Sequence, residues 1–116
     1  MSEILPNPER GKEVFELDRK YVFHSWSAQG QISPLPVAGG KDSYFWDFEG
    51  KKYLDFSCQL VFTNIGFQHP KVIDAIKAQA DVLATVAPQV ANDVRSEAAR
   101  RIVELAGSKF AKVFFT

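Results

Sequence analysis

The chain has 116 residues, enough for one domain with a modest core. Hydrophobic residues make up 46% and charged residues 24% of it, which is ordinary for a soluble globular protein. The 14 Lys and Arg residues balance the 14 Asp and Glu residues. No basic stripe is present, which argues against a nucleic-acid-binding protein that relies on phosphate contacts.

The expected location is the cytoplasm. No apolar run approaches the roughly 20 residues that a membrane span needs. The first eight residues lack the basic and apolar regions of a signal peptide. The single cysteine, Cys58, excludes an intramolecular disulfide and fits a reducing compartment. We therefore expect neither a membrane nor a nucleic acid as a partner.

The N-terminal third predicts one helix preceded by an irregular arm. Residues 1–8 carry two prolines, and residues 9–26 repeat apolar side chains at helical spacing with charges on the other face. His24 and Trp26 place two aromatic rings at the end of this helix. They form either a hydrophobic clamp that docks the arm or part of a pocket. Residues 27–42, rich in Gln, Gly, Ser and Pro, predict a loop.

A β-hairpin is predicted next. Residues 43–47 and 52–56 are aromatic-rich strands, and residues 48–51 turn between them with Gly50 at a position that favours positive φ. A lone hairpin is marginal in water. Residues 35–38 are a candidate third strand, at an edge where Pro36 is tolerated.

Residues 55–70 predict the wall of a pocket. The segment begins as a strand, is apolar from Leu60 to Phe62, turns at Asn64 and Gly66, and enters a helix at Pro70. Apolar side chains on a segment that must also bend suggest a pocket wall rather than a plain core strand.

The C-terminal part predicts two helices and a strand. The helices cover residues 70–83 and residues 92 or 93 to 106, each with an apolar face expected to be buried, and Gly107 ends the second. A loop joins them over residues 84–91. Residues 110–116 are a strand candidate whose apolar edge has nothing after it. We therefore expect this chain to be the front portion of a larger protein.

The residues by themselves indicate no catalytic centre. His24, His69 and Cys58 do not have the spacing of a zinc site, and neither G-x-G-x-x-G nor a P-loop occurs. Both histidines are interpreted as structural, and Cys58 as a small buried residue. Asp47 and Asp55 are more typical of turns or surface than of an acid–base pair. The sequence indicates no metal-binding residue.

Three segments together resemble class III aminotransferases, which are pyridoxal-phosphate enzymes of fold type I. Residues 43–56, SYFWDFEGKKYLDF, resemble their N-terminal hairpin, and residues 64–70, NIGFQHP, resemble their Asn-x-Gly-His-x-His-Pro segment. The chain departs from that segment at Phe67. Residues 112–116, KVFFT, resemble the strand before the family's Gly- and Glu-containing loop. The residues around Trp26 and Cys58 favour the ω-amino-acid and taurine–pyruvate type.

The resemblance implies an α/β fold, which as an isolated fragment is α+β. It would consist of an N-terminal helix, a small antiparallel sheet with a hairpin, two helices and the first strand of the large domain. Its expected parts are an arm with a helix (1–34), a small sheet with the pocket wall (35–69) and the start of the large pyridoxal-phosphate domain (70–116). A homodimer is expected for the full-length protein.

The implied reaction is transamination from an ω-amino acid or amine donor to a keto acid such as pyruvate. In the family the phosphate loop, the pyridine aspartate and the Schiff-base lysine lie beyond the position of Thr116. The resemblance therefore assigns no catalytic and no cofactor-binding residue here. We expect the fragment alone to be inactive and not to bind pyridoxal phosphate. The alternative is a non-catalytic binding or dimerisation module derived from such an enzyme.

What the resemblance assigns to this chain is the substrate-side wall. Trp26 matches an aromatic position of the arm, and Val61 matches a position where relatives tune donor size. A small Val61 and a small Ala87 would leave room beside the cofactor. The expected substrate-binding residues are Trp26, Leu60, Val61, Phe62, Ala87 and Pro88.

Overall fold

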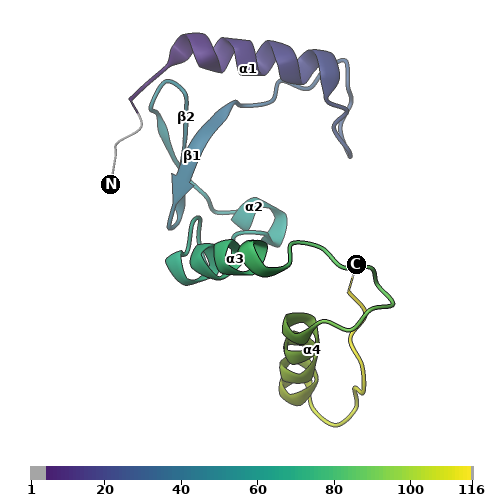
Figure 1. The fold of residues 1–116 in the computed structure, drawn as a ribbon. Coiled ribbons are helices and arrows are strands. Elements are labelled where there is room, and N and C mark those ends of the chain that lie inside the picture. Colours follow the sequence, from purple (N-terminus) through teal and green to yellow (C-terminus); the bar gives the residue numbers. More distant parts are fainter. Residues whose placement is uncertain (1–4, 116) are drawn as a thin grey trace. The chain divides into compact units, whose positions relative to one another are not determined.

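The computed structural model describes residues 5–115. In chain order its elements are α1 (Pro8–Tyr21), β1 (Val37–Lys41), β2 (Tyr44–Asp47), β3 (Lys52–Leu54), α2 (Cys58–Val61), α3 (Pro70–Val82) and α4 (Asp93–Ala106). Figure 1 shows these elements along the chain. The chain forms two compact units, one ending at Ala75 and the other beginning at Ile76. This set of helices with a small antiparallel sheet confirms the predicted fold class.

Helix α1 begins where the sequence favours a start, but it ends earlier than predicted. The Asn7 side chain accepts a hydrogen bond from the Arg10 N–H at 3.0 Å, and proline stands at the first helical position. The last helical residue is Tyr21, and the Val22 N–H closes the final turn on the Asp18 carbonyl. The predicted extension to residue 26 is wrong, because the next residues form a separate loop.

The helix α1 packs on the turn of the hairpin. The Asn7 N–H donates to the Phe48 carbonyl at 2.7 Å. Gly11, the buried residue of α1, lies so close to Phe48 that a Cβ at this position would come within 2.9 Å of the Phe48 Cβ. The absence of a side chain at Gly11 therefore permits the contact between helix and hairpin.

The sheet is antiparallel with the order β1-β2-β3. The hairpin is confirmed, although β3 ends at Leu54 rather than at residue 56. The third strand is also confirmed at an edge, but β1 begins at Val37 and continues through Gly39 and Gly40, which were predicted to lie in a loop.

Two aromatic rings explain why the glycines belong to β1. A Cβ on Gly39 would lie 2.9 Å from the Trp46 ring, and one on Gly40 would lie 2.7 Å from the Phe67 ring. Glycine in a strand often marks such a close approach. Phe67 also pairs with Asp42 through two backbone hydrogen bonds of 2.7 and 3.1 Å, so the chain after α2 returns to the sheet.

The helices α3 and α4 have nearly the predicted bounds. The His69 carbonyl accepts from the Val72 and Ile73 N–H groups at the start of α3. The Asn92 side chain caps α4, and Gly107 ends it at a φ of 90°. The strand predicted over residues 110–116 is not observed, because residues 110–115 pair with no other strand in the described part of the chain; Thr116 lies outside it.

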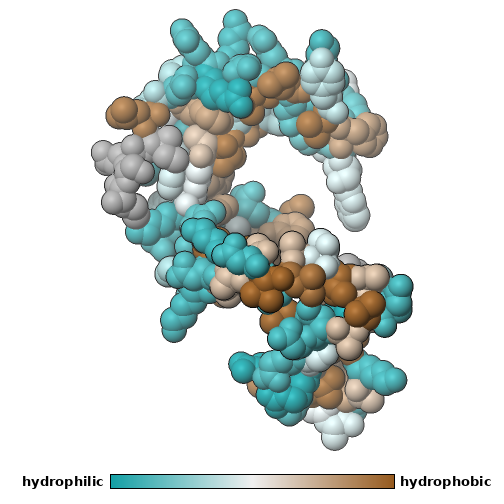
Figure 2. All heavy atoms as spheres, in the orientation of Figure 1, coloured by the Kyte–Doolittle hydropathy of each residue, from teal (hydrophilic) through white to brown (hydrophobic). Residues whose placement is uncertain are grey.

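No apolar side chain among the described residues is fully buried. The faces of α3 and α4 that were expected to be covered are open, with Ile76 59% and Leu105 88% exposed. Apolar residues, brown in Figure 2, are correspondingly visible at the surface. No helix in the described part of the chain is long and apolar enough to cross a membrane.

Candidate functional site

The predicted wall residues Leu60, Val61 and Phe62 lie in and directly after α2. This element is a single turn rather than the strand that the sequence predicts. Its residues Cys58, Gln59, Leu60 and Val61 have φ values of 50°, 45°, 56° and 82°. All four therefore lie in the left-handed region.

A left-handed turn of this kind is unfavourable for the residues that form it. Left-handed backbone costs roughly 1–2 kcal/mol per residue for residues with a Cβ, because the Cβ crowds the following carbonyl oxygen. The φ of Val61 is the least favourable of the four, since its side chain is β-branched. Such a conformation persists only where surrounding contacts hold it, and it is found preferentially at functional sites.

The side chain of Asp55 makes the contacts that hold this turn. Its Oδ1 accepts from the Ser57 N–H at 3.2 Å, the Ser57 hydroxyl at 3.1 Å and the Gln59 N–H at 3.4 Å. Its Oδ2 accepts from the Thr63 hydroxyl at 2.8 Å. The Thr63 N–H in turn donates to the Cys58 carbonyl at 3.0 Å. Asp55 thus bonds to residues on both sides of the left-handed run.

These hydrogen bonds also set the charge of the carboxyl group. Partial desolvation on its own raises the pKa of Asp55, but the bonds from Thr63, Ser57 and Gln59 outweigh it and lower the pKa below its ordinary value. The group is therefore an anion at neutral pH, and its two oxygens are already engaged.

The turn presents its apolar side chains to solvent. Leu60, Val61 and Phe62 are 80%, 70% and 85% exposed. The arrangement supplies apolar surface of defined shape, while the neighbouring carboxylate is committed to structural hydrogen bonds. It can therefore contact and orient an apolar group of a ligand.

Trp26 lies in the loop after α1, which the side chain of Gln29 closes. The Gln29 amide accepts from the His24 N–H at 3.1 Å and donates to the His24 carbonyl at 2.5 Å. His24 Nε2 lies 2.7 Å from Asp18 Oδ1, which connects the loop to α1. Trp26 has a φ of 60° and a fully exposed side chain. The sequence left two roles open for Trp26, a hydrophobic clamp that docks the arm and part of a pocket. Because its ring is fully exposed, it does not act as a clamp in the described part of the chain.

The remaining predicted residues, Ala87 and Pro88, lie in the loop between α3 and α4. The Ala87 carbonyl accepts from the Val90 N–H at 3.0 Å. The guanidinium of Arg95 donates to the carbonyls of Pro88 and Val90. This loop belongs to the second unit, whereas Trp26 and residues 60–62 belong to the first. The structure therefore brings together Leu60, Val61 and Phe62 as neighbours in one turn.

The sequence predicted a turn or surface role for Asp55, but it did not predict that Asp55 holds the left-handed turn of the wall residues. The signal was present, because an Asp side chain often accepts from the backbone N–H two residues further along in a turn, as Asp55 does from Ser57. Asp47 has the matching role in the hairpin, accepting from the N–H groups of Glu49 and Lys51 and from the Tyr53 hydroxyl. The part played by Gln29 left no comparable sequence signal.

The structure also describes a cavity of about 390 Å³ in the first unit, between α1 and the hairpin. Lys12, Phe15, Asp47, Lys51 and Tyr53 are among its lining residues. Both oxygens of Asp47 already accept hydrogen bonds, and the Lys51 ammonium lies 5.0 Å from the centre of the Tyr53 ring. Asp47, Lys51 and Tyr53 therefore interact with one another rather than converge on a ligand.

Metal ligands are not grouped in this part of the chain. Among the described residues, no set of three or more His, Cys, Asp or Glu side chains is placed to hold a metal ion. His69 Nδ1 is buried and has no hydrogen-bond partner among them.

Comparison with known proteins gives a consistent result. A family model described as aminotransferase class-III matches residues 26–116. Mitochondrial ornithine aminotransferase of Rattus norvegicus is 36% identical over 100 residues, covering 84% of this chain and 21% of the relative. Acetylornithine aminotransferase of Methanosarcina acetivorans is 33% identical over 106 residues, covering 91% of this chain and 25% of the relative.

Solved structures resemble the chain as well. The taurine:2-oxoglutarate aminotransferase of Bifidobacterium kashiwanohense, in complex with PLP and glutamate, is 39% identical with a TM-score of 0.77, over 91% of this chain and 22% of that one. An S-selective transaminase from an Arthrobacter species with alanine bound is 34% identical with a TM-score of 0.71, over 80% and 20%. The chain thus spans about a fifth to a quarter of the length of these proteins.

Proposed function

This chain belongs to the class-III aminotransferase family, and on that premise we propose that it is the N-terminal part of a pyridoxal-phosphate-dependent aminotransferase. The reaction moves an amino group from an ω-amino acid or amine donor to a keto acid such as pyruvate. The observation that carries the proposal is the family match over residues 26–116, which includes the hairpin and the wall-forming turn.

The named relatives support a donor whose amino group is remote from its acid group. Ornithine and taurine, which appear in the names of two similar proteins, both carry such an amine. Alanine, bound in the Arthrobacter structure, is the amino form of pyruvate, whereas glutamate is the amino form of 2-oxoglutarate. Pyruvate is our proposed acceptor, and 2-oxoglutarate is the competitor that an assay must include.

The cavity beside α1 does not support a site for the cofactor itself. A pyridoxal-phosphate site needs a lysine amine, a carboxylate that can receive the pyridine N–H, and donors for the phosphate. The cavity beside α1 is lined by two lysines and two carboxylates, Lys12, Lys51, Asp47 and Glu49, but Asp47 has both oxygens engaged and Lys51 lies over Tyr53. We propose that residues beyond this chain bind the cofactor and that the 116-residue chain alone is inactive.

Within the whole enzyme this chain would supply structure and substrate surface. We propose that residues 1–34 form an arm, that residues 35–69 form the small sheet and the pocket wall, and that residues 70–116 begin the large domain. Trp26, Leu60, Val61, Phe62, Ala87 and Pro88 would contact the substrates. A homodimer would cover part of the exposed apolar surface.

A direct test is an amino-transfer assay of the full-length protein with pyridoxal phosphate. Taurine, ornithine and a simple primary amine would be offered as donors, with pyruvate or 2-oxoglutarate as acceptor, and alanine or glutamate would be quantified. Alanine formation with at least one donor is expected. A full-length protein that transfers no amino group from any of these donors would refute the proposal.

The 116-residue chain provides the matched control. We expect it to show neither amino transfer nor the absorbance band of an enzyme-bound cofactor. Stoichiometric binding of pyridoxal phosphate by this chain would contradict the assignment of the cofactor site to other residues.

The alternative function is a non-catalytic binding or dimerisation module, and the exposed apolar residues favour it as a second candidate. Leu105 and Phe114 are 88% and 89% exposed, as expected of residues that are covered in an assembly. A 116-residue chain that occurs in cells as a separate, stably folded protein bound to a partner would favour this alternative.

A further inference from the structure

The α2 turn, residues 58–61, exposes its apolar side chains while its backbone is held in an unfavourable conformation. Four successive residues other than glycine have positive φ, from 45° to 82°. A chain segment without support would leave this region, because right-handed and extended conformations are favoured for all four. The positions of the exposed Leu60 and Val61 side chains therefore depend on the contacts that keep the turn in its left-handed conformation.

The support comes from a residue outside the wall. Asp55 bonds to Ser57 and Gln59 at the entrance of the turn and to Thr63 at its exit. Hydrogen bonds to an ionised carboxylate are among the stronger ones in proteins. The carboxylate thus joins the two ends of the turn, and the Thr63 N–H closes it on the Cys58 carbonyl.

We propose that Asp55 is a positioning residue for the amino donor: by holding α2 in its left-handed conformation, it sets where Leu60, Val61 and Phe62 meet the donor's apolar part. This inference rests on the proposed function, because it assumes that the turn faces the substrate. It adds a residue that touches no substrate but controls which donors fit.

The test compares variants of the full-length enzyme. Asp55→Ala removes all four hydrogen bonds to the turn. We expect the ratio of kcat/KM for 1-phenylethylamine to that for 3-aminopropanoate to change by about tenfold, because a misplacement of about 1 Å can cost up to about 100-fold in rate. The cofactor absorbance should remain at the wild-type level. Asp55→Asn keeps one acceptor oxygen and should give a smaller change.

A second substitution separates positioning from general damage. Gln59→Gly places glycine at a φ of 45°, where glycine is favoured. If Asp55 acts by holding the left-handed turn, adding Gln59→Gly to Asp55→Ala should restore part of the wild-type donor ratio. A further loss in the double variant would overturn the proposal.

Asp47→Ala is the matched control. Asp47 also accepts from two backbone N–H groups and a side-chain hydroxyl, but it does so in the hairpin turn. We expect both alanine variants to be less stable than the wild type, and only Asp55→Ala to change the donor ratio. An equal change in Asp47→Ala would show that the effect is general destabilisation and would overturn the proposal.

A measurement independent of activity completes the design. Hydrogen–deuterium exchange of the segment containing Thr63 should be about tenfold faster in Asp55→Ala. The Thr63 N–H donates to the Cys58 carbonyl, and this bond should open more often once Asp55 no longer holds the turn. Unchanged exchange there would overturn the inference even in a protein without transaminase activity. An inactive wild type would refute the proposed function alone, and an active wild type with an unchanged donor ratio in Asp55→Ala would refute this inference alone.

Discussion

At the residue scale, Gly11 shows how one missing side chain determines a contact between elements. Glycine inside a helix costs roughly 1 kcal/mol relative to alanine. At this position a Cβ would come within 2.9 Å of the Phe48 Cβ. Since both atoms are close to the backbone, neither can move aside without shifting α1 or the hairpin.

We predict that Gly11→Ala destabilises the chain despite the better helix propensity of alanine. Overpacking costs about 1–3 kcal/mol, so a net loss of roughly 1 kcal/mol is expected in urea unfolding. Gly30→Ala is the matched control, since no atom lies within 4 Å of the added Cβ. It should be neutral or slightly stabilising. Equal midpoints for Gly11→Ala and the wild type would contradict the close contact.

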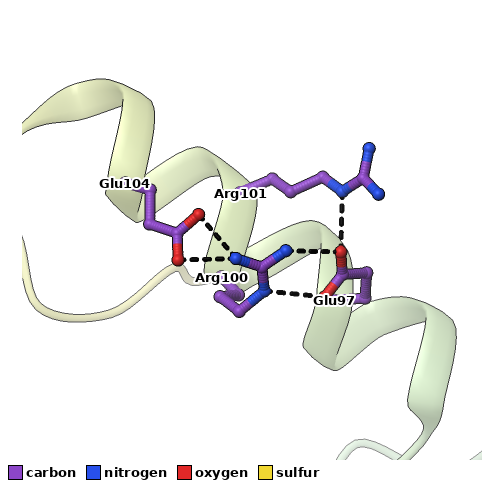
Figure 3. Close-up of polar contacts among 4 residues, drawn as sticks. All are labelled: Glu97, Arg100, Arg101 and Glu104. Carbon is purple, nitrogen blue, oxygen red and sulfur yellow. Dashed lines mark hydrogen bonds and ion pairs between the residues drawn. The ribbon is translucent and has the colours of Figure 1, made fainter.

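A second residue-scale prediction concerns the ion pairs of α4 (Figure 3). Arg100 donates two hydrogen bonds to Glu97, at 2.7 and 2.8 Å, and also bonds Glu104; Arg101 donates one to Glu97 at 2.7 Å. The bonds from Arg100 and then Arg101 lower the pKa of Glu97 from 4.5 to about 2. Because the folded-state pKa is the lower one, the stabilisation exists above pH 4.5 and is lost as the pH falls towards 2.

An NMR titration of the Glu97 carboxyl group tests this assignment. The wild-type midpoint should lie well below that of an isolated glutamate. Arg100→Gln should raise it more than Arg101→Gln, because Arg100 makes two of the three bonds. High salt should reduce the shift, since the groups are partly exposed. An ordinary midpoint in the wild type at low salt would rule the network out.

At the element scale, the end of α1 was mispredicted because the side chain of Gln29, which lies outside the helix, determines it. The apolar spacing favours helix to residue 26, but Gln29 bonds both the N–H and the carbonyl of His24. Those backbone groups are therefore not available for helical bonds. The amide of a residue five positions later leaves no periodic signal in the sequence.

We predict that Gln29→Ala loosens the loop that carries Trp26 while α1 remains helical. Loss of the bond to the His24 N–H should speed exchange at this amide by about tenfold, as expected for one net hydrogen bond. Gln31→Ala is the matched control, because only its backbone N–H bonds within this loop. Equal exchange of the His24 amide in the two variants would contradict the role of Gln29.

The α2 turn was predicted as a strand for a related reason. Apolar runs of this length are consistent with a strand, and strand propensity is high for Val61 and Phe62. The hydrogen bonds of Asp55 and Thr63 bend the chain instead. The predicted turns at Asn64 and Gly66 are observed, with Gly66 at a φ of 85°. A glycine in the sequence indicates that a turn is possible at its position. Four residues other than glycine give no sequence signal that they will adopt a left-handed conformation.

At the scale of the whole molecule, many large apolar residues are exposed among the described residues. Phe56, Phe62 and Phe114 are 91%, 85% and 89% exposed, and Figure 2 shows how widely apolar residues reach the surface. Contiguous apolar surface in a soluble protein usually marks contacts with other protein.

We therefore predict that the 116-residue chain self-associates or is poorly soluble when it is produced alone. Light scattering after size-exclusion chromatography should show species larger than a monomer. Replacing Phe62 and Phe114 by serine should shift the distribution towards monomer, whereas replacing the already polar Gln89 by serine should not. A stable, well-folded monomer of the unmodified chain would contradict this expectation and favour the module alternative.

The sequence alone determined the elements whose signals are local. The hairpin, α3 and α4 follow from turn residues, from caps such as Asn92 and Gly107, and from apolar spacing, all within a few residues. The succession of motifs also led to the family. The tertiary structure alone decided that Gly39 and Gly40 belong to a strand, that α1 stops at Tyr21, and that Leu60 to Phe62 project from a left-handed turn held by Asp55. Each of these features depends on a contact with a particular side chain that only the folded structure identifies. Such a contact leaves no periodic pattern of apolar or turn residues in the sequence.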